Sequence, residues 1–301
     1  MKRFFLVLLA LFTGVIARAQ YSEIGFCGGV SFYMGDLNPK GVFKGSRPAG
    51  GILFRYNINP RLAFKATALF GSLQASDATT GEDKARNLSF RSPLSELSAQ
   101  LELNFLRLYN EKGQNPFSPY LFLGISVFSF NPQAELNGIW YDLQPLGTEG
   151  QDLNIRDAAG TMYDQKRYGL TGFSIPMGIG MRVNFLKYYC VGLEWGFRAT
   201  FTDYIDDVSG VYVDRDLLIE YRSRLIADLA DRTTTMKSGE EGIPDYHKAG
   251  TARGNNAKTK DWYSFAILSF SFKLNYTKDC TVKTGTSVAH TKAKKKKTTF
   301  R

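Results

Sequence analysis

One histidine and one serine are the residues of this chain whose types and spacing could support nucleophilic chemistry. His247 follows Asp245 by two positions, and Ser264 lies further along the chain. A serine nucleophile, a histidine base and an orienting carboxylate are the parts of an acyl-transfer or hydrolytic site. A polar surface stretch explains His247 equally well, so we expect no catalytic site and no enzyme activity.

Metal and cofactor chemistry has little support in the sequence. Neither His247 nor His290 has a neighbouring histidine or cysteine at metal-ligand spacing, so we expect no metal and no cofactor. The cysteines Cys27, Cys190 and Cys280 leave two alternatives open. One is a single disulfide, between Cys27 and Cys190, with one thiol left over; the other is unpaired small buried residues.

The positive charge of the chain is concentrated at its two ends. The formal net charge is +10, and three of these charges are Lys2, Arg3 and Arg18. Residues 277–301 hold seven lysines, one arginine and one aspartate, so residues 20–276 are formally neutral. A basic surface of the kind that binds nucleic acid is therefore not indicated, and no nucleic-acid partner is expected.

Both ends are predicted to lie outside the folded domain. Residues 1–19 combine two basic residues, an apolar run at 4–16 and small residues before Gln20, the pattern of a Sec signal peptide. Residues 277–301 have no apolar periodicity and are expected to form a basic, disordered periplasmic tail. An acidic protein, anionic lipid headgroups or solvent could face its lysines, which include Lys292, Lys294, Lys295, Lys296 and Lys297.

Between these ends, eight segments alternate apolar with small or polar residues, the period of a β-strand. In the clearest segment, Leu97, Leu101 and Leu103 oppose Gln100 and Glu102, a separation that a helix would scatter. The other segments lie near residues 24–34, 52–58, 62–70, 121–127, 175–185, 189–197 and 266–274. We expect the apolar set to face outward and the small and polar set to face inward.

The links between these segments alternate in length. The short links are residues 59–60, 107–118 and 186–188, and the long ones are residues 36–47, 76–88, 131–167 and 204–260. An even number of strands with this alternation is typical of an outer-membrane barrel whose termini both lie in the periplasm. The prediction is an all-β, eight-stranded antiparallel transmembrane barrel over residues 20–276, located in the outer membrane, with long extracellular loops. A soluble lipocalin-like barrel is disfavoured, because it would bury its apolar face inward.

Aromatic residues are expected near the two membrane interfaces. Tyr109, Tyr188, Tyr189 and Tyr276 fall near the short links, and Trp262 and Tyr263 near the long ones.

Inward positions carry a nearly balanced set of charges, and an eight-stranded barrel leaves room only for its own side chains. Paired charges could form a gated polar path or a structural network of salt bridges, and we favour the structural network. The predicted network consists of Glu23, Arg55, Lys65, Glu96, Glu102, Arg182, Glu194, Arg198 and Lys273.

The last long link is predicted to contain one amphipathic helix over residues 214–231. Leu217, Leu218, Tyr221, Leu225 and Leu229 recur there at helical spacing among charged residues. A lid packed on the other loops is favoured over a partner-binding helix.

Five motifs resemble the Bacteroidota outer-membrane barrel family that includes PorG. They are GDLN at residues 35–38, RPAGG at 47–51, RYNINPR at 55–61, YDLQPLGTEGQ at 141–151 and FTDYIDDV at 201–208. PorG is the outer-membrane barrel of the type IX secretion system, associated with a periplasmic ring of PorK and PorN. The resemblance implies a similar anchoring role for this chain.

The expected function is therefore an anchor or scaffold of a secretion complex. Its expected partners are outer-membrane lipid and a periplasmic ring lipoprotein like PorK or PorN. A surface-exposed binding protein or adhesin that uses the long loops is the first alternative. A lipid-modifying enzyme is the second, because acyltransferases and lipid A deacylases of this architecture place His and Ser at the outer rim.

Overall fold

A computed structural model shows the fold of the chain. It describes residues 21–40, 43–81, 85–106, 116–158, 160–185, 188–234, 236, 242, 244–254 and 259–274. The predicted signal peptide, the predicted tail, Cys280, Tyr109 and Tyr276 lie outside the described residues.

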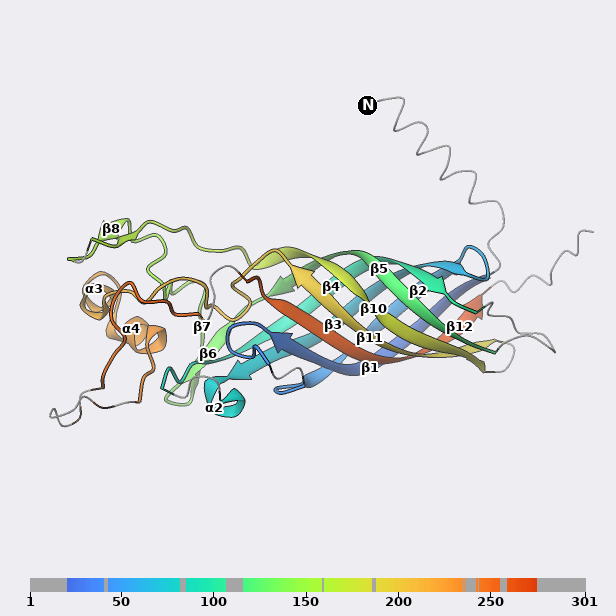
Figure 1. Cartoon of the computed structure of the whole chain (residues 1–301), viewed down its shortest axis with the longest axis horizontal. Helices are drawn as coiled ribbons and strands as arrows, with labels where there is room; N and C mark the ends of the chain where they lie inside the picture. The colour runs from blue at the N-terminus through green and yellow to red at the C-terminus, as the bar shows by residue number, and fades with distance from the viewer. Residues whose placement is uncertain are drawn as a thin grey trace, which may run out of the picture.

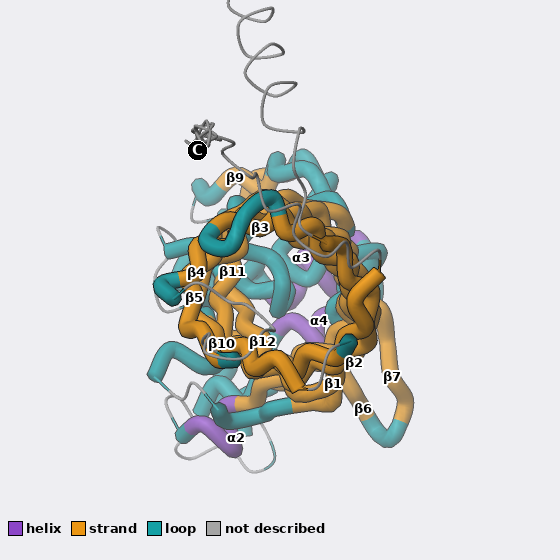
Figure 2. The backbone as a smooth tube through the Cα atoms, turned by 90° about the vertical axis from the view of Figure 1, so that its right-hand side faces the viewer, coloured by secondary structure: helices purple, strands orange, loops and turns teal. Residues whose placement is uncertain are grey.

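Eight long strands form a closed antiparallel barrel, which confirms the predicted fold (Figures 1 and 2). The strands are β1 (Tyr21–Met34), β2 (Arg47–Asn57), β3 (Leu62–Ser76), β4 (Ser89–Asn104), β5 (Phe117–Phe130), β10 (Thr171–Phe185), β11 (Tyr189–Thr200) and β12 (Trp262–Leu274). Each barrel strand pairs with the barrel strands before and after it in the chain, and β12 pairs with β1 to close the ring. All side chains in this register alternate between lipid and lumen.

The links at one end of the barrel are short. Between β2 and β3, the Asn59 side chain accepts hydrogen bonds from the backbone N–H groups of Arg61 and Leu62, both at 2.8 Å. This side chain closes the short turn at Asn59 and Pro60 locally.

The links at the other end fold together into a cap (Figure 1). We name them loop 1 (residues 35–46), loop 2 (77–88), loop 3 (131–170) and loop 4 (201–261). They contain α2 (Asp77–Thr80), β6 (Gln133–Leu136), β7 (Ile139–Asp142), β8 (Ile155–Arg156), β9 (Met162–Tyr163), α3 (Arg215–Tyr221) and α4 (Arg224–Ala230). Figure 1 shows these elements gathered beyond the barrel rim, opposite the short links.

The outer wall of the barrel is apolar and exposed. Its exposed side chains come from all eight strands and include Phe26, Phe54, Phe70, Leu101, Leu123, Ile179, Leu193 and Leu268. A contiguous belt of this kind is stable only against lipid. The chain is therefore an integral outer-membrane barrel with its short links in the periplasm and its cap outside the cell.

No helix among the described residues is long and apolar enough to cross a membrane.

Two predictions of local structure are wrong. Loop 4 contains two short helices where one was expected, because α3 ends before Arg222 and Ser223 begins a new helix by accepting from the Ile226 N–H at 3.3 Å. Tyr263 faces the lumen and is fully buried, so it is no interface aromatic. Its position follows from the alternation along β12, where the even-numbered residues 266–274 face lipid.

The inward face is also less polar than expected. In the extracellular half of the lumen, apolar side chains form a core that is continuous with loops 1 and 4. This core includes Leu69, Leu73, Phe90, Leu94, Phe128, Phe130, Phe265 and Ile267 from the barrel, and Leu37, Ile205 and Val208 from the loops. These barrel positions contact the folded cap instead of water, so the hydrophobic effect favours apolar residues there.

Candidate functional site: the closed lumen and the extracellular cap

Six of the predicted lumenal charges form one connected network in the periplasmic half of the barrel: Glu23, Arg55, Lys65, Glu102, Arg182 and Glu194. Arg55 joins two carboxylates, with Nη1 2.7 Å from Glu23 Oε2 and Nε 2.8 Å from Glu102 Oε2. Lys65 Nζ lies 3.1 Å from Glu102 Oε1 and also pairs with Glu194. Glu23, Arg55, Lys65 and Glu102 are buried, and buried ions of this kind are tolerated only when they are paired.

Glu96 and Arg198 form a second, separate pair nearer the cap. The Arg198 guanidinium donates to both Glu96 oxygens, at 3.1 and 3.3 Å, and Glu96 also accepts from the Tyr263 hydroxyl at 2.7 Å. Arg198 Cζ lies 4.7 Å from the centroid of the Phe265 ring, at the base of the apolar core. The pair therefore lies next to the apolar core of the lumen.

Arg182 and Lys273 also lie in the periplasmic half of the lumen, where Lys273 is the register partner of Glu23. The Arg182 guanidinium donates to Asn104 Oδ1 at 2.9 Å and to Asn57 Oδ1 at 3.3 Å. Lys273 Nζ lies 4.8 Å from the centroid of the Tyr21 ring. The structure thus places all nine predicted lumenal residues inward, but it does not join them into one network.

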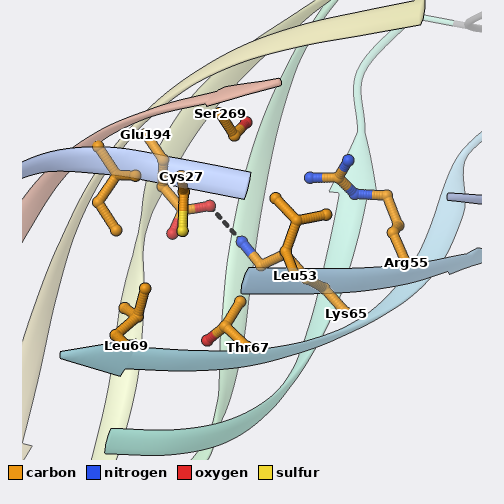
Figure 3. Close-up of a pocket in the computed structure, with 9 residues that line it drawn as sticks. Cys27, Leu53, Arg55, Lys65, Thr67, Leu69, Glu194 and Ser269 are labelled. Atoms are coloured by element: carbon orange, nitrogen blue, oxygen red, sulfur yellow. Dashed lines mark hydrogen bonds and ion pairs between the residues drawn. The ribbon is translucent and has the colours of Figure 1, made fainter. Parts of the chain in front are cut away.

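A small cavity of about 20 Å³ separates the charge network from the apolar core (Figure 3). Figure 3 shows the thiol of Cys27 and the Glu194–Lys65 pair beside it, and Leu69 borders it on the side of the core. A cavity of this size has room for about one water molecule. Ion pairs thus fill the lumen on the periplasmic side of this cavity, and apolar side chains fill it on the side of the cap.

Cys27 and Cys190 are both free thiols. They lie on β1 and β11, and β12 runs between these two strands. Of the two sequence alternatives, the structure therefore supports unpaired cysteines for this pair.

Arg253 of loop 4 is the central cation of the cap. It is buried, and its Nη1 lies 3.2 Å from Thr148 Oγ1, 3.2 Å from Glu149 Oε1 and 2.5 Å from the Asp207 carbonyl oxygen. Glu149 accepts two more bonds, from the N–H groups of Ser209 and Gly210, both at 3.0 Å. These contacts tie loop 3 to both ends of loop 4.

Arg86 makes the matching connection for loops 1 and 2. It donates to both carboxylate oxygens of Asp77, at 2.9 and 2.6 Å, within loop 2. It also donates to the carbonyl oxygens of Arg253 at 3.0 Å and Asp36 at 3.1 Å. All four loops are therefore linked through buried arginines, and the cap is one folded unit.

Tyr33 joins the barrel rim to loop 4 through two carboxyl groups. Its hydroxyl lies 2.6 Å from Asp206 Oδ2 and 2.5 Å from Asp261 Oδ1, and all three side chains are buried. A hydroxyl can donate its one proton to only one of the two groups, so the second close contact requires a protonated carboxyl. Burial, reinforced by neighbouring aspartates, raises the pKa of both Asp206 and Asp261 well above the usual range.

The residues of the candidate catalytic site are not brought together as the sequence suggested. The carboxylate next to His247 belongs to Asp231, with Oδ1 3.1 Å from Nδ1, and the imidazole ring stacks on Tyr212 at 4.2 Å. The Ser264 hydroxyl is buried in the barrel wall and donates to the Gly196 carbonyl oxygen at 2.8 Å. His247 and Asp231 therefore join two parts of loop 4.

Within the described part of the chain, no cluster of His, Cys, Asp and Glu side chains could hold a metal ion.

Sequence reasoning missed the elements that build the cap. Asn137 and Gly138 both have positive φ, 54° and 80°, and form the turn of the β6–β7 hairpin. An Asn-Gly pair between two apolar segments is a strong hairpin signal that was available in the sequence. Arg86 and Arg253 carried no comparable signal, because they join segments that are far apart in the sequence, as in the Arg86 bond to the Arg253 carbonyl oxygen.

Comparisons with known proteins name no activity for this chain. The family model of a domain of unknown function, DUF6089, matches residues 2–142, just under half of the chain. A search of curated proteins finds no match.

Three solved structures illustrate the structural similarity. The N-terminal β-barrel domain of Pseudomonas aeruginosa OprF is 10% identical, with a TM-score of 0.35, and the alignment covers 85% of this chain and 100% of that one. Ail of Yersinia pestis is 8% identical, with a TM-score of 0.38 and the same coverage. Neisserial surface protein A is 11% identical, with a TM-score of 0.37, covering 84% of this chain and 97% of that one.

Proposed function

We propose that this chain is a non-enzymatic outer-membrane anchor, which holds a secretion complex at the membrane through its periplasmic face. The observation that carries the proposal is the closed lumen. The Arg55 network, the apolar core around Phe128 and the arginine-linked cap lie in series along the barrel axis. Such a barrel offers no route for a solute, so its role is to hold a partner at the membrane.

The five motifs support a more specific form of this proposal, an anchor similar to PorG of type IX secretion in Bacteroidota. GDLN at residues 35–38 and FTDYIDDV at 201–208 include Asp36 and Asp206, which lie in the buried contacts of the cap. In this proposal, outer-membrane lipid surrounds the apolar belt, and a periplasmic ring lipoprotein like PorK or PorN is the partner. Nucleic acid is not a partner.

The test is the location of the periplasmic complex in cells with and without the chain. Membrane sedimentation should bring the ring proteins down with the outer membrane when the chain is present. Without the chain, the ring should be lost from the outer-membrane fraction and other outer-membrane proteins should remain. A ring that stays with the outer membrane in the deletion strain contradicts an anchoring role.

One observation favours surface binding as a second candidate function. The β6–β7 hairpin leaves β7 at the edge of the sheet, with Ile139 and Trp140 56% and 39% exposed. An exposed edge strand with apolar side chains can pair with a strand of another protein. Binding of cells or host proteins that is lost on replacing Ile139 and Trp140 by serine would favour this candidate over the anchor.

A further inference from the structure

The lumenal layer next to the periplasm contains buried hydrogen-bond donors without acceptors. Lys273 Nζ, Arg182 Nε and Asn104 Nδ2 have no hydrogen-bond partner among the described residues, and the three side chains are at most 2% exposed. Lys273 is the penultimate residue of β12, and Asn104 is the last residue of β4. The unsatisfied donors therefore lie where the lumen meets the short-link end.

The carboxylates of the same half of the barrel are already engaged by other partners. Glu23 accepts from Arg55 at 2.7 Å, from Asn57 at 3.1 Å and from Ser271 at 2.8 Å. The Arg182 guanidinium lies 3.5 Å from Glu102 and 3.8 Å from Glu23, beyond ordinary hydrogen-bond distance. Lys273 makes no ion pair within 4.0 Å in the described part of the chain.

Among the described residues, the charges in this half do not balance. Four cations, Arg55, Lys65, Arg182 and Lys273, face three carboxylates, Glu23, Glu102 and Glu194. Burying an uncompensated cation is costly, so a counter-charge at this position is favoured. The free donors comprise an ammonium, a guanidinium N–H and an amide N–H, a set that makes charge-assisted bonds to a carboxylate.

We propose that the periplasmic mouth of the lumen binds one carboxylate group, held by Lys273, Arg182 and Asn104. The carboxylate comes either from a small free acid or from an acidic side chain of a periplasmic polypeptide. The binding site is independent of the proposed anchoring function, because it requires only the folded barrel.

The test is binding of trifluoroacetate to the purified full-length chain, measured through the linewidth of its fluorine NMR signal. Saturable broadening that acetate reverses is the expected result. Lys273→Gln should weaken binding about tenfold or more, the scale of one lost charge-assisted hydrogen bond. Two matched controls make the same charge change elsewhere, Lys248→Gln in the cap and Lys296→Gln in the tail, and both should bind like the parent chain.

A competition experiment distinguishes the two sources of the carboxylate. Displacement of trifluoroacetate by a short polyglutamate peptide with blocked ends, at lower concentration than acetate, assigns the site to a polypeptide. Displacement by acetate alone assigns it to a small acid. Broadening that does not saturate, or that all three variants reduce equally, overturns the proposal.

A second measurement applies if Lys273→Gln fails to fold. The unfolding midpoint of the unaltered chain should rise with acetate concentration at constant ionic strength, because a ligand stabilises the state that binds it. Lys273→Arg should keep this dependence, since it retains the cation. Equal midpoints in acetate and chloride overturn the assignment of a carboxylate.

Discussion

The guanidinium of Arg253 and the carboxylate of Glu149 form a buried ion pair, with Nη1 3.2 Å from Oε1, that joins loop 4 to loop 3. Both groups also bond the backbone or side chains of their neighbours, so the pair lies at the centre of the cap. The long loops are therefore held as a plug over a lumen that is itself filled. This arrangement distinguishes the protein from a barrel with mobile loops.

Arg253→Gln should loosen the cap and leave the barrel closed. Removing one partner of a buried, hydrogen-bonded ion pair costs about 3–5 kcal/mol, and here the cost falls on the contacts between loops 3 and 4. Hydrogen exchange should rise in residues 146–151 and 203–210, with strand protection unchanged. Arg156→Gln, at an exposed position in loop 3, is the matched control. Equal protection in both variants would contradict the claim that Arg253 holds loops 3 and 4 together.

The cap should be more stable at acidic than at neutral pH. Burial, reinforced by neighbouring aspartates, raises the pKa of Asp206 and Asp261 well above the usual range. The unfolded loop releases these protons at lower pH than the folded cap does, so stability falls as pH rises from about 4 toward the raised values. Hydrogen exchange of residues 203–208, corrected for intrinsic rate, should report this fall.

Asp261→Asn is the variant that tests the shared proton. An amide at this position cannot ionise, so the pH dependence of local opening should shrink while the hydrogen bond to Tyr33 can be kept. Asp245→Asn changes an exposed acid of the same loop and should leave the dependence as it is. An unchanged dependence in Asp261→Asn would contradict the assignment.

Glu102→Gln should destabilise the barrel strongly, because Arg55 and Lys65 would share one carboxylate fewer. Loss of a partner in a buried network costs about 3–5 kcal/mol. Urea unfolding of the chain in lipid vesicles gives the free energy of unfolding directly. Glu135→Gln, an exposed change in the cap, should cost little. Equal effects of the two changes would argue against a paired lumen.

Leu101→Arg tests the lipid-facing assignment. The side chain of Leu101 is 54% exposed on the outer wall, in the apolar belt. An arginine near the bilayer midplane costs about 2–4 kcal/mol, and the cost falls to about 0–1 kcal/mol near the interfaces. Phe173→Arg, at the extracellular end of β10, should therefore cost less than Leu101→Arg in the same unfolding assay. The reverse order would require a different membrane position for the barrel.

The barrel could be predicted from the sequence because its signal is local. Leu101 and Gln100 are assigned to opposite faces by alternation alone, and the same rule places Arg55 and Glu102 inward. The rule was misapplied at Tyr263, whose odd number places it in the lumen.

The cap and the closure of the lumen could not be predicted in the same way. Phe128 and Phe265 face inward in an apolar core because loops 1 and 4 cover them, and that contact has no sequence period. Arg86 meets Arg253 across 167 positions in the chain, and His247 takes Asp231 as its partner instead of the nearer Asp245. Local signals existed for the helical segment of loop 4 and for the β6–β7 hairpin, which carries the Asn137-Gly138 pair.

An anchor that works from the periplasm is tested most directly by deleting residues 283–301 and measuring recovery of the periplasmic ring with the purified barrel. The deletion removes seven positive charges, Lys283, Lys292, Lys294, Lys295, Lys296, Lys297 and Arg301, and no acidic residue. Recovery should fall, and salt should have the same effect on the full chain, because the screening length drops from about 10 Å at 0.1 M to about 3 Å at 1 M. The barrel should still migrate as a heat-resistant species. Recovery that is indifferent to both the deletion and salt would contradict electrostatic anchoring through the tail.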